Sequence, residues 1–171
     1  MSIQHGAWGY DKQAIANGAV YSLDELINYL ANSAVRNMSF LLNISPDRHG
    51  VIPQIHQQRL REMGAWLKKA GDAIYGTRGG PWEPVEGQYG YTYKDSTIFA
   101  HLLKGYAKGT FRVPPMGELR VEKVYDVFTG APLDYTPYDG GIEVNHLNRE
   151  SSPADTIIAI VYDQPVANVW K

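Results

Sequence analysis

The sequence contains no cysteine, so a disulfide framework is excluded and cysteine usage does not indicate the cellular compartment. No apolar run approaches the ~20 residues that a membrane-spanning helix needs. The net charge of -2 gives no basic footprint for nucleic acid. The sequence also lacks a phosphate-binding loop, a dinucleotide fingerprint and a nucleophile elbow, and its five histidines are too scattered for a zinc site. We therefore predict no cofactor, no metal, no nucleic-acid partner and no membrane span.

The composition that remains is that of an ordinary globular protein. The chain has 171 residues, of which 44% are hydrophobic, enough for one or two small domains. Its character changes at Gly79–Pro84, where two glycines and two prolines fall within six residues. Helical patterns precede this segment and strand-like patterns follow it. The sequence therefore predicts one domain over residues 1–78 and a second over residues 79–171.

The residue pattern of the first part predicts helices around one buried strand. Ser22 and Glu25 form a capping box at the start of a helix that extends to Val35. The apolar run from Phe40 to Ile44 is too continuous for a half-exposed strand and favours a strand covered on both faces. A polar turn follows, and then Pro53 opens an amphipathic helix that reaches about Ala70.

The second part predicts an antiparallel β-sandwich, because short strand-like runs alternate with turn residues and show no helical period. The candidate strands are Tyr89–Lys94, Thr97–Leu103, Thr110–Val113, Arg120–Tyr125, Gly141–Val144 and Thr156–Val161. By contrast, Met1 to Tyr21 has no periodicity of its own and is predicted to be a loop.

Several motifs in fixed order resemble the α-L-fucosidase family of retaining glycoside hydrolases. They are Gly6-Ala7-Trp8-Gly9-Tyr10-Asp11, then Leu-Leu-Asn-Ile-x-Pro at 41–46 and Gly-x-Ile-Pro at 50–53, and Gly-Asp-Ala-Ile-Tyr-Gly-Thr-Arg at 71–78. The resemblance implies α/β plus all-β architecture: the closing βα units of a (β/α)8-like barrel followed by an antiparallel β-sandwich. A complete barrel needs roughly 250 residues, so we expect this chain to represent the C-terminal portion of such an enzyme.

The resemblance also implies that the catalytic pair is missing from this chain. Retaining glycosidases use a carboxylate nucleophile and a carboxyl acid/base. In this family both precede the Trp-Gly-Tyr segment, so we expect no catalytic residue here. Asp11, Asp24, Glu25 and Asp47 are better explained as helix caps and turn residues.

Three residues are candidates for substrate binding. The resemblance places Trp8 near the C5 methyl group of fucose, where a flat apolar ring would favour methyl over hydroxymethyl; packing between loop and barrel is the alternative. Asn43, at the end of the predicted strand, would contact the sugar or orient the neighbouring loop. His5 lies in the same loop as Trp8 and would line the pocket.

Two functions compete. The first is the C-terminal part of an α-L-fucosidase that releases terminal α-linked L-fucose from glycoconjugates. Its partners would be a fucosylated glycan and an upstream barrel portion or companion chain. Self-association is another way to cover the predicted strand from Phe40 to Ile44. A secreted or periplasmic location suits the parent enzyme. The second is a non-catalytic carbohydrate-binding or interaction protein, suggested by Tyr89, Tyr91, Tyr93, Tyr106, Tyr135 and Tyr138.

Overall fold

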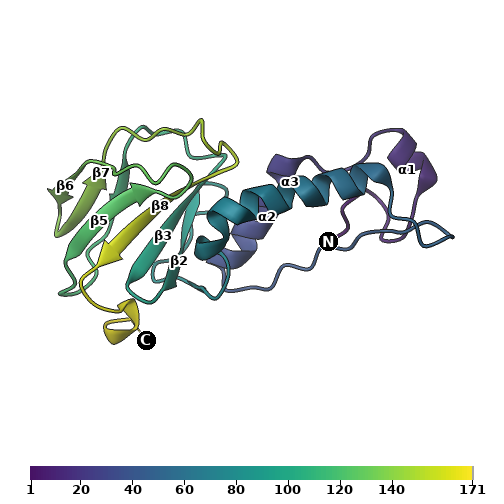
Figure 1. The fold of residues 1–171 in the computed structure, drawn as a ribbon. Helices are drawn as coiled ribbons and strands as arrows, with labels where there is room; N and C mark the ends of the chain where they lie inside the picture. Colours follow the sequence, from purple (N-terminus) through teal and green to yellow (C-terminus); the bar gives the residue numbers. More distant parts are fainter. Residues whose placement is uncertain (171) are drawn as a thin grey trace.

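A pair of helices and two β-sheets form three successive layers in the computed structural model, which describes residues 1–170 (Figure 1). The helices are α1 (Lys12–Ala16), α2 (Leu23–Val35) and α3 (Gln54–Ala70), with 3-10 turns η1 (Gly71–Ala73) and η2 (Val166–Asn168). Within the described residues no helix is long and apolar enough to cross a membrane.

All strands pair antiparallel, in two sheets. The five-stranded sheet has the order β1-β2-β3-β8-β5, and the three-stranded sheet has the order β4-β7-β6. The strands are β1 (Arg78–Gly79), β2 (Tyr89–Lys94), β3 (Thr97–Leu103), β4 (Phe111–Val113), β5 (Val121–Asp126), β6 (Tyr135–Tyr138), β7 (Gly141–Val144) and β8 (Asp155–Tyr162). This sheet-rich half confirms the expectation of a strand-dominated second part.

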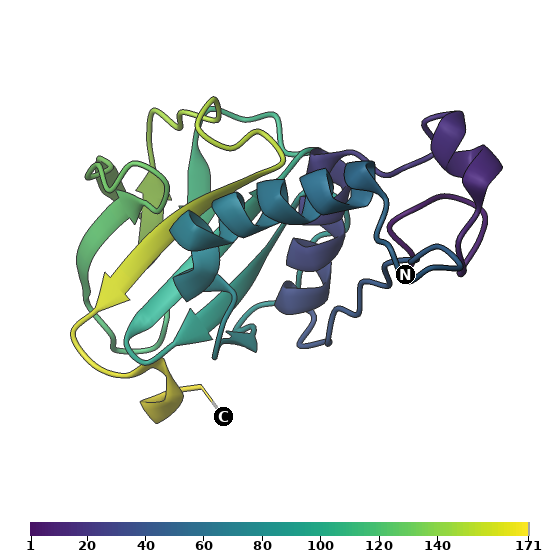
Figure 2. The ribbon, with the colours of Figure 1, turned by 45° about the vertical axis from the view of Figure 1, so that its right-hand side comes forward.

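The five-stranded sheet is buried on both faces, which explains the nearly continuous apolar runs of β3 and β8. One face, with Ile98 and Ile158, packs against the three-stranded sheet. The other face, with Phe99 and Ile157, packs against α2, α3 and η1. The contact involves the C-terminal part of α3, with Trp66 and Ala70; α3 passes in front of the strands in Figure 2, and the rest of it extends away from the sheets in Figure 1. The helices are thus a covering layer of the sheet.

Buried polar contacts also join the helical layer to the sheet. Trp66 on α3 donates its indole N–H to Ser152 Oγ at 3.0 Å. Thr92 on β2 donates to the carbonyl of Ala73 in η1 at 2.7 Å, and His101 Nε2 lies 3.0 Å from the same hydroxyl. His101 Nδ1 in turn lies 2.7 Å from Asp155 Oδ2. These contacts satisfy polar groups that would otherwise be costly to bury.

The predicted helices are confirmed. Ser22 and Glu25 form the expected reciprocal capping box, and α2 ends at Val35. Pro53 is the N-cap of α3 and not its first residue. The prediction that Met1 to Tyr21 is a loop is wrong in one stretch, because Asp11 accepts hydrogen bonds from the Gln13 and Ala14 amides and caps α1.

The predicted strands agree with the structure to within a residue or so at each end. Strand β6 was missed because Pro137 sits inside it; β6 is an edge strand, where a missing amide donor is tolerated. The short strand β1 lies inside the segment where the sequence changes character and pairs with β2.

The prediction of a strand from Phe40 to Ile44 buried on both faces is wrong for the described chain. The segment is extended, but only Asn43 forms a bridge, parallel to Ser2. Phe40, Leu42 and Ile44 pack against α2 and α3, whereas Leu41 is 64% exposed. The segment therefore has one covered face and one open face, and the apolar Leu41 lies on the open one.

Candidate functional site

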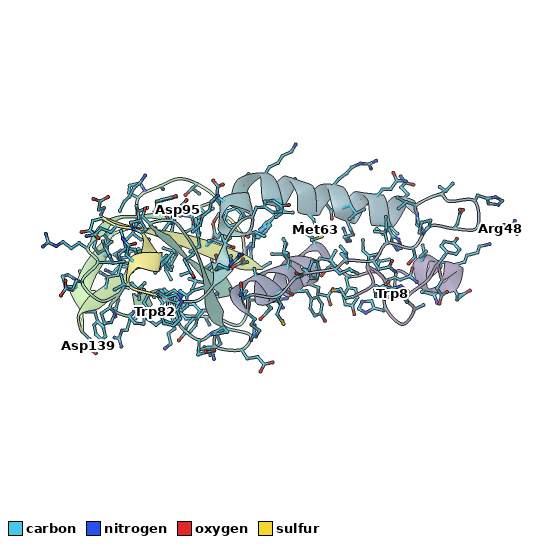
Figure 3. All side chains as sticks on the ribbon, turned by 90° about the horizontal axis from the view of Figure 1, so that it is seen from below. Trp8, Arg48, Met63, Trp82, Asp95 and Asp139 are labelled. Atoms are coloured by element: carbon cyan, nitrogen blue, oxygen red, sulfur yellow. The ribbon has the colours of Figure 1, made fainter. Side chains whose placement is uncertain are left out.

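A fifteen-residue loop carries two of the three predicted site residues and is closed at its base. An antiparallel bridge joins Gln4 to Val20, and the amide of His5 donates to the carbonyl of Ala19 at 2.9 Å. On its other side, the segment that enters the loop pairs in parallel through Ser2 and Asn43. The loop therefore starts from paired backbone segments at the end of the molecule remote from the sheets, where Figure 3 shows Trp8.

Trp8 is the most prominent side chain of this loop, with 61% of its surface exposed. Its backbone, unlike its ring, is held firmly. The carbonyl of Trp8 accepts hydrogen bonds from Asn43 Nδ2 and from Ser45 Oγ, the latter at 3.0 Å. The neighbouring Gly9 carbonyl accepts one from Gln4 Nε2 at 2.6 Å. The loop thus presents an open aromatic face from a fixed main chain.

The other two predicted site residues lie close to this arrangement in different ways. Asn43 donates its side-chain amide to the carbonyl of Trp8, 35 residues away in the sequence. His5 is exposed, and its ring lies against Tyr21 with centroids 3.8 Å apart. Asn43 therefore contacts the backbone of Trp8, and His5 stacks at the base of the same loop.

The carboxylates singled out in the first part lie at helix starts or in a turn. Asp11 caps α1, Asp24 stands in the first turn of α2, and Asp47 accepts the amides of His49 and Val51. Hydrogen bonds from the side chain and amide of Ser22 lower the pKa of Glu25. These contacts are those expected of caps and turns.

The histidines are as dispersed in space as in sequence. His56 on α3 is fully buried with no partner for either ring nitrogen, and burial lowers its pKa, so it is held neutral. His101 belongs to the buried network between sheet and helices. Within residues 1–170 no group of three or more His, Asp or Glu side chains is arranged to hold a metal ion.

The tyrosines that suggested a carbohydrate-binding surface mostly serve the core between the two sheets. Tyr91 and Tyr106 are buried, and Tyr89 and Tyr93 pack partly against the same cluster. The exposed pair is on β6, where Tyr135 is 37% and Tyr138 43% exposed. The aromatic surface of the sheets is therefore smaller than the sequence suggested.

Known proteins with similar sequences and folds are α-L-fucosidases. The profile of the α-L-fucosidase family matches residues 1–72. Plasma α-L-fucosidase of Rattus norvegicus is 34% identical over 143 residues, which are 80% of this chain and 30% of the relative. α-L-Fucosidase of Branchiostoma floridae is 35% identical over 107 residues, which are 60% of this chain and 23% of the relative. α-L-Fucosidase isoenzyme 1 from Paenibacillus thiaminolyticus has a similar fold, with a TM-score of 0.80, 24% identity, and coverage of 96% of this chain and 39% of the other.

The chain resembles α-L-fucosidases in sequence and in fold. It corresponds to the C-terminal portion of these proteins and spans only about 30% of the length of the first of them. The part matched by the fucosidase profile contains all three predicted site residues, Trp8, Asn43 and His5.

Sequence reasoning missed two residues of this site, Gln4 and Ser45. Both are polar side chains only 2% exposed, and both bind the backbone of the fucosidase-like loop. Ser45 gave no signal, because its partner lies 37 residues away in the sequence. Gln4 gave none, because its burial depends on a loop that returns only at Val20.

Proposed function

We propose that this chain is the C-terminal part of an α-L-fucosidase that hydrolyses terminal α-linked L-fucose from glycoconjugates with retention. The observation that carries the proposal is the length of the match to the rat enzyme. At 143 residues it is longer than either the helical part or the sheet part alone, so the likeness includes both. The rat protein is named a plasma α-L-fucosidase, and the same reaction is proposed for the enzyme to which this chain contributes.

In this proposal Trp8 forms one wall of the sugar pocket. An exposed indole offers a flat apolar surface to the C5 methyl group of fucose, and such a surface disfavours a hydroxymethyl group in the same place. His5 and Asn43 stand beside it, with Asn43 acting through the loop backbone.

The nucleophilic Asp and the acid/base Glu are proposed to lie outside this chain. The local contacts of Asp11, Glu25 and Asp47 support this, since each is already engaged in a cap or turn, and Asp24 lies in the first turn of α2. Without a nucleophile the covalent step of a retaining glycosidase cannot occur.

Residues 1–78 are proposed to close a (β/α)8-like barrel, and residues 79–171 to form its β-sandwich. The parallel bridge between Ser2 and Asn43, with α2 between the two segments and α3 after them, supports a βαβα unit. The shared core of the two antiparallel sheets supports a sandwich, with the helices of the barrel part packed on its outer face.

The open side of the Phe40–Ile44 segment is proposed to receive the upstream barrel portion of the enzyme. Leu41 is 64% exposed there, on the side that faces away from α2 and α3, and Met38, just before the segment, is 56% exposed. Leu41→Asp should leave the free chain folded but abolish co-elution with the upstream portion, whereas Tyr138→Asp on β6 should not. Homodimers that Leu41→Asp dissociates would point to self-association in its place.

Hydrolysis of an aryl α-L-fucoside tests the proposed activity. We expect no turnover by this chain alone and measurable turnover when it is combined with an upstream barrel portion that carries the two carboxylates. Turnover by the pure chain would contradict the placement of the catalytic pair. Glycan binding without turnover in the combined protein would favour a carbohydrate-binding role based on Tyr135 and Tyr138.

A further inference from the structure

The loop that carries Trp8 needs something to hold it. The segment around it reads Gly6-Ala7-Trp8-Gly9, with Gly9 directly after the tryptophan and Gly6 two residues before it, and Gly6 has a φ of +81°. Glycine widens the set of accessible backbone conformations, so this sequence on its own specifies no single orientation for the indole. The ring is largely exposed and gains little from packing.

Three side chains from outside this segment constrain its backbone. Asn43 and Ser45 both donate to the carbonyl of Trp8, which uses its two lone pairs, and Gln4 donates to the carbonyl of Gly9. Two consecutive peptide groups are therefore fixed from two directions, one set by the 1–4 segment and the other by the 43–45 segment.

The burial of the donors indicates that these bonds matter. Gln4 and Ser45 are each only 2% exposed, and a buried amide or hydroxyl is unfavourable unless it is hydrogen-bonded. Gln4 Oε1 has no partner, so the residue is retained in a buried position with only its donor side satisfied. An apolar side chain would avoid that penalty but would lose the donor to the Gly9 carbonyl.

We propose that Gln4, Asn43 and Ser45 are positioning residues that clamp the Trp8–Gly9 backbone and so fix the indole face of Trp8. The clamp stands on the contacts within this chain. Its use in presenting Trp8 to the methyl group of a fucosyl unit rests on the proposed function, where a preorganised wall would lower the ordering cost of binding.

The test uses the full chain labelled with 5-fluorotryptophan, whose four tryptophans give four fluorine signals. Trp8→Phe assigns the Trp8 signal. Asn43→Asp combined with Ser45→Ala replaces one donor with an acceptor and deletes the other without adding bulk. We expect the transverse relaxation rate of Trp8 to fall about twofold, because ring and backbone gain nanosecond motion. An unchanged rate would overturn the clamp.

Matched controls separate the clamp from general loosening. Asn32→Asp and Gln57→Met change side chains that also donate to main-chain carbonyls, but on α2 and α3, and should leave the Trp8 signal unchanged. The signal of Trp66, buried and bonded to Ser152, reports whether each variant is folded. If the double variant unfolds, Ser45→Ala alone is compared with Ser45→Thr, which keeps the hydroxyl and should restore the wild-type rate.

Titration with L-fucose and with L-galactose, which carries a hydroxymethyl group in place of the methyl, separates the clamp from the proposed function. We expect fucose to shift the Trp8 signal more than galactose does, and the clamp variants to reduce that shift. Faster Trp8 motion in the variants with no response to fucose in the wild type would keep the clamp and reject the sugar-facing role. A fucose response that the variants leave intact would reject the clamp as a positioning device.

Discussion

A glycine on β2 allows α2 to approach the five-stranded sheet. A Cβ atom built on Gly90 would lie 2.7 Å from both Cβ and Cγ2 of Val35, at the end of α2, and 3.0 Å from Cβ of Pro84. Carbon atoms in good contact are about 3.5–4.0 Å apart, so the added methyl group would be almost 1 Å too close. The strand cannot easily retreat, because Gly90 is paired with His101 on β3.

Gly90→Ala should therefore destabilise the chain by about 1–3 kcal/mol, the usual cost of overpacking a closely packed site. For a chain of this size that corresponds to a fall in Tm of about 2–4 °C per kcal/mol. Differential scanning calorimetry at fixed pH measures it directly.

The same substitution elsewhere provides the control. Gly64 lies in the middle of α3, and a Cβ there would meet no atom within 4 Å. Gly64→Ala should stabilise the chain by about 0.5–1 kcal/mol, because alanine loses less conformational freedom on forming a helix. A Gly90→Ala variant that melts at or above the wild-type temperature would refute the close approach of α2 to β2.

Three further outcomes follow from buried polar groups. His101→Leu leaves the carboxyl of Asp155 buried without its partner and should cost about 3–5 kcal/mol in urea denaturation; a loss below 1 kcal/mol would argue against the network. Burial raises the pKa of Tyr91, so stability should be constant below the unfolded-state value of about 10 and decline above it, and Tyr91→Phe should reduce that decline. Burial lowers the pKa of His56, so the unfolded chain binds a proton that the folded chain excludes; stability should fall as pH drops below about 6.5, and His56→Met should flatten this dependence.

Local patterns determined much of the fold. The capping box of Ser22 and Glu25 specifies where α2 begins, because both partners lie within one helical turn. The Asp139-Gly140 pair specifies the hairpin between β6 and β7, because both residues adopt positive φ there. Such signals are short-range, so a single sequence contains all that is needed to interpret them.

The three-layer arrangement was decided by tertiary structure. The apolar runs of β3 and β8 indicate cover on both faces, but not that α2 and α3 supply one of the covers. At Phe40–Ile44 an equally continuous apolar run also indicated cover on both faces, but one face is open at Leu41. An apolar residue in the sequence indicates only that its side chain can be buried. Whether the side chain is buried depends on which segments fold against it.

The candidate site divides in the same way. The sequence by itself singled out Trp8 and Asn43, because they stand in motifs shared with a known family, and His5, because it lies in the same loop as Trp8. Only the folded chain brings Gln4 and Ser45 to the carbonyls of Gly9 and Trp8, across separations of 5 and 37 residues. Side-chain hydrogen bonds to a distant main chain have no periodicity and no fixed spacing, so they become apparent only when the segments that carry them meet in space.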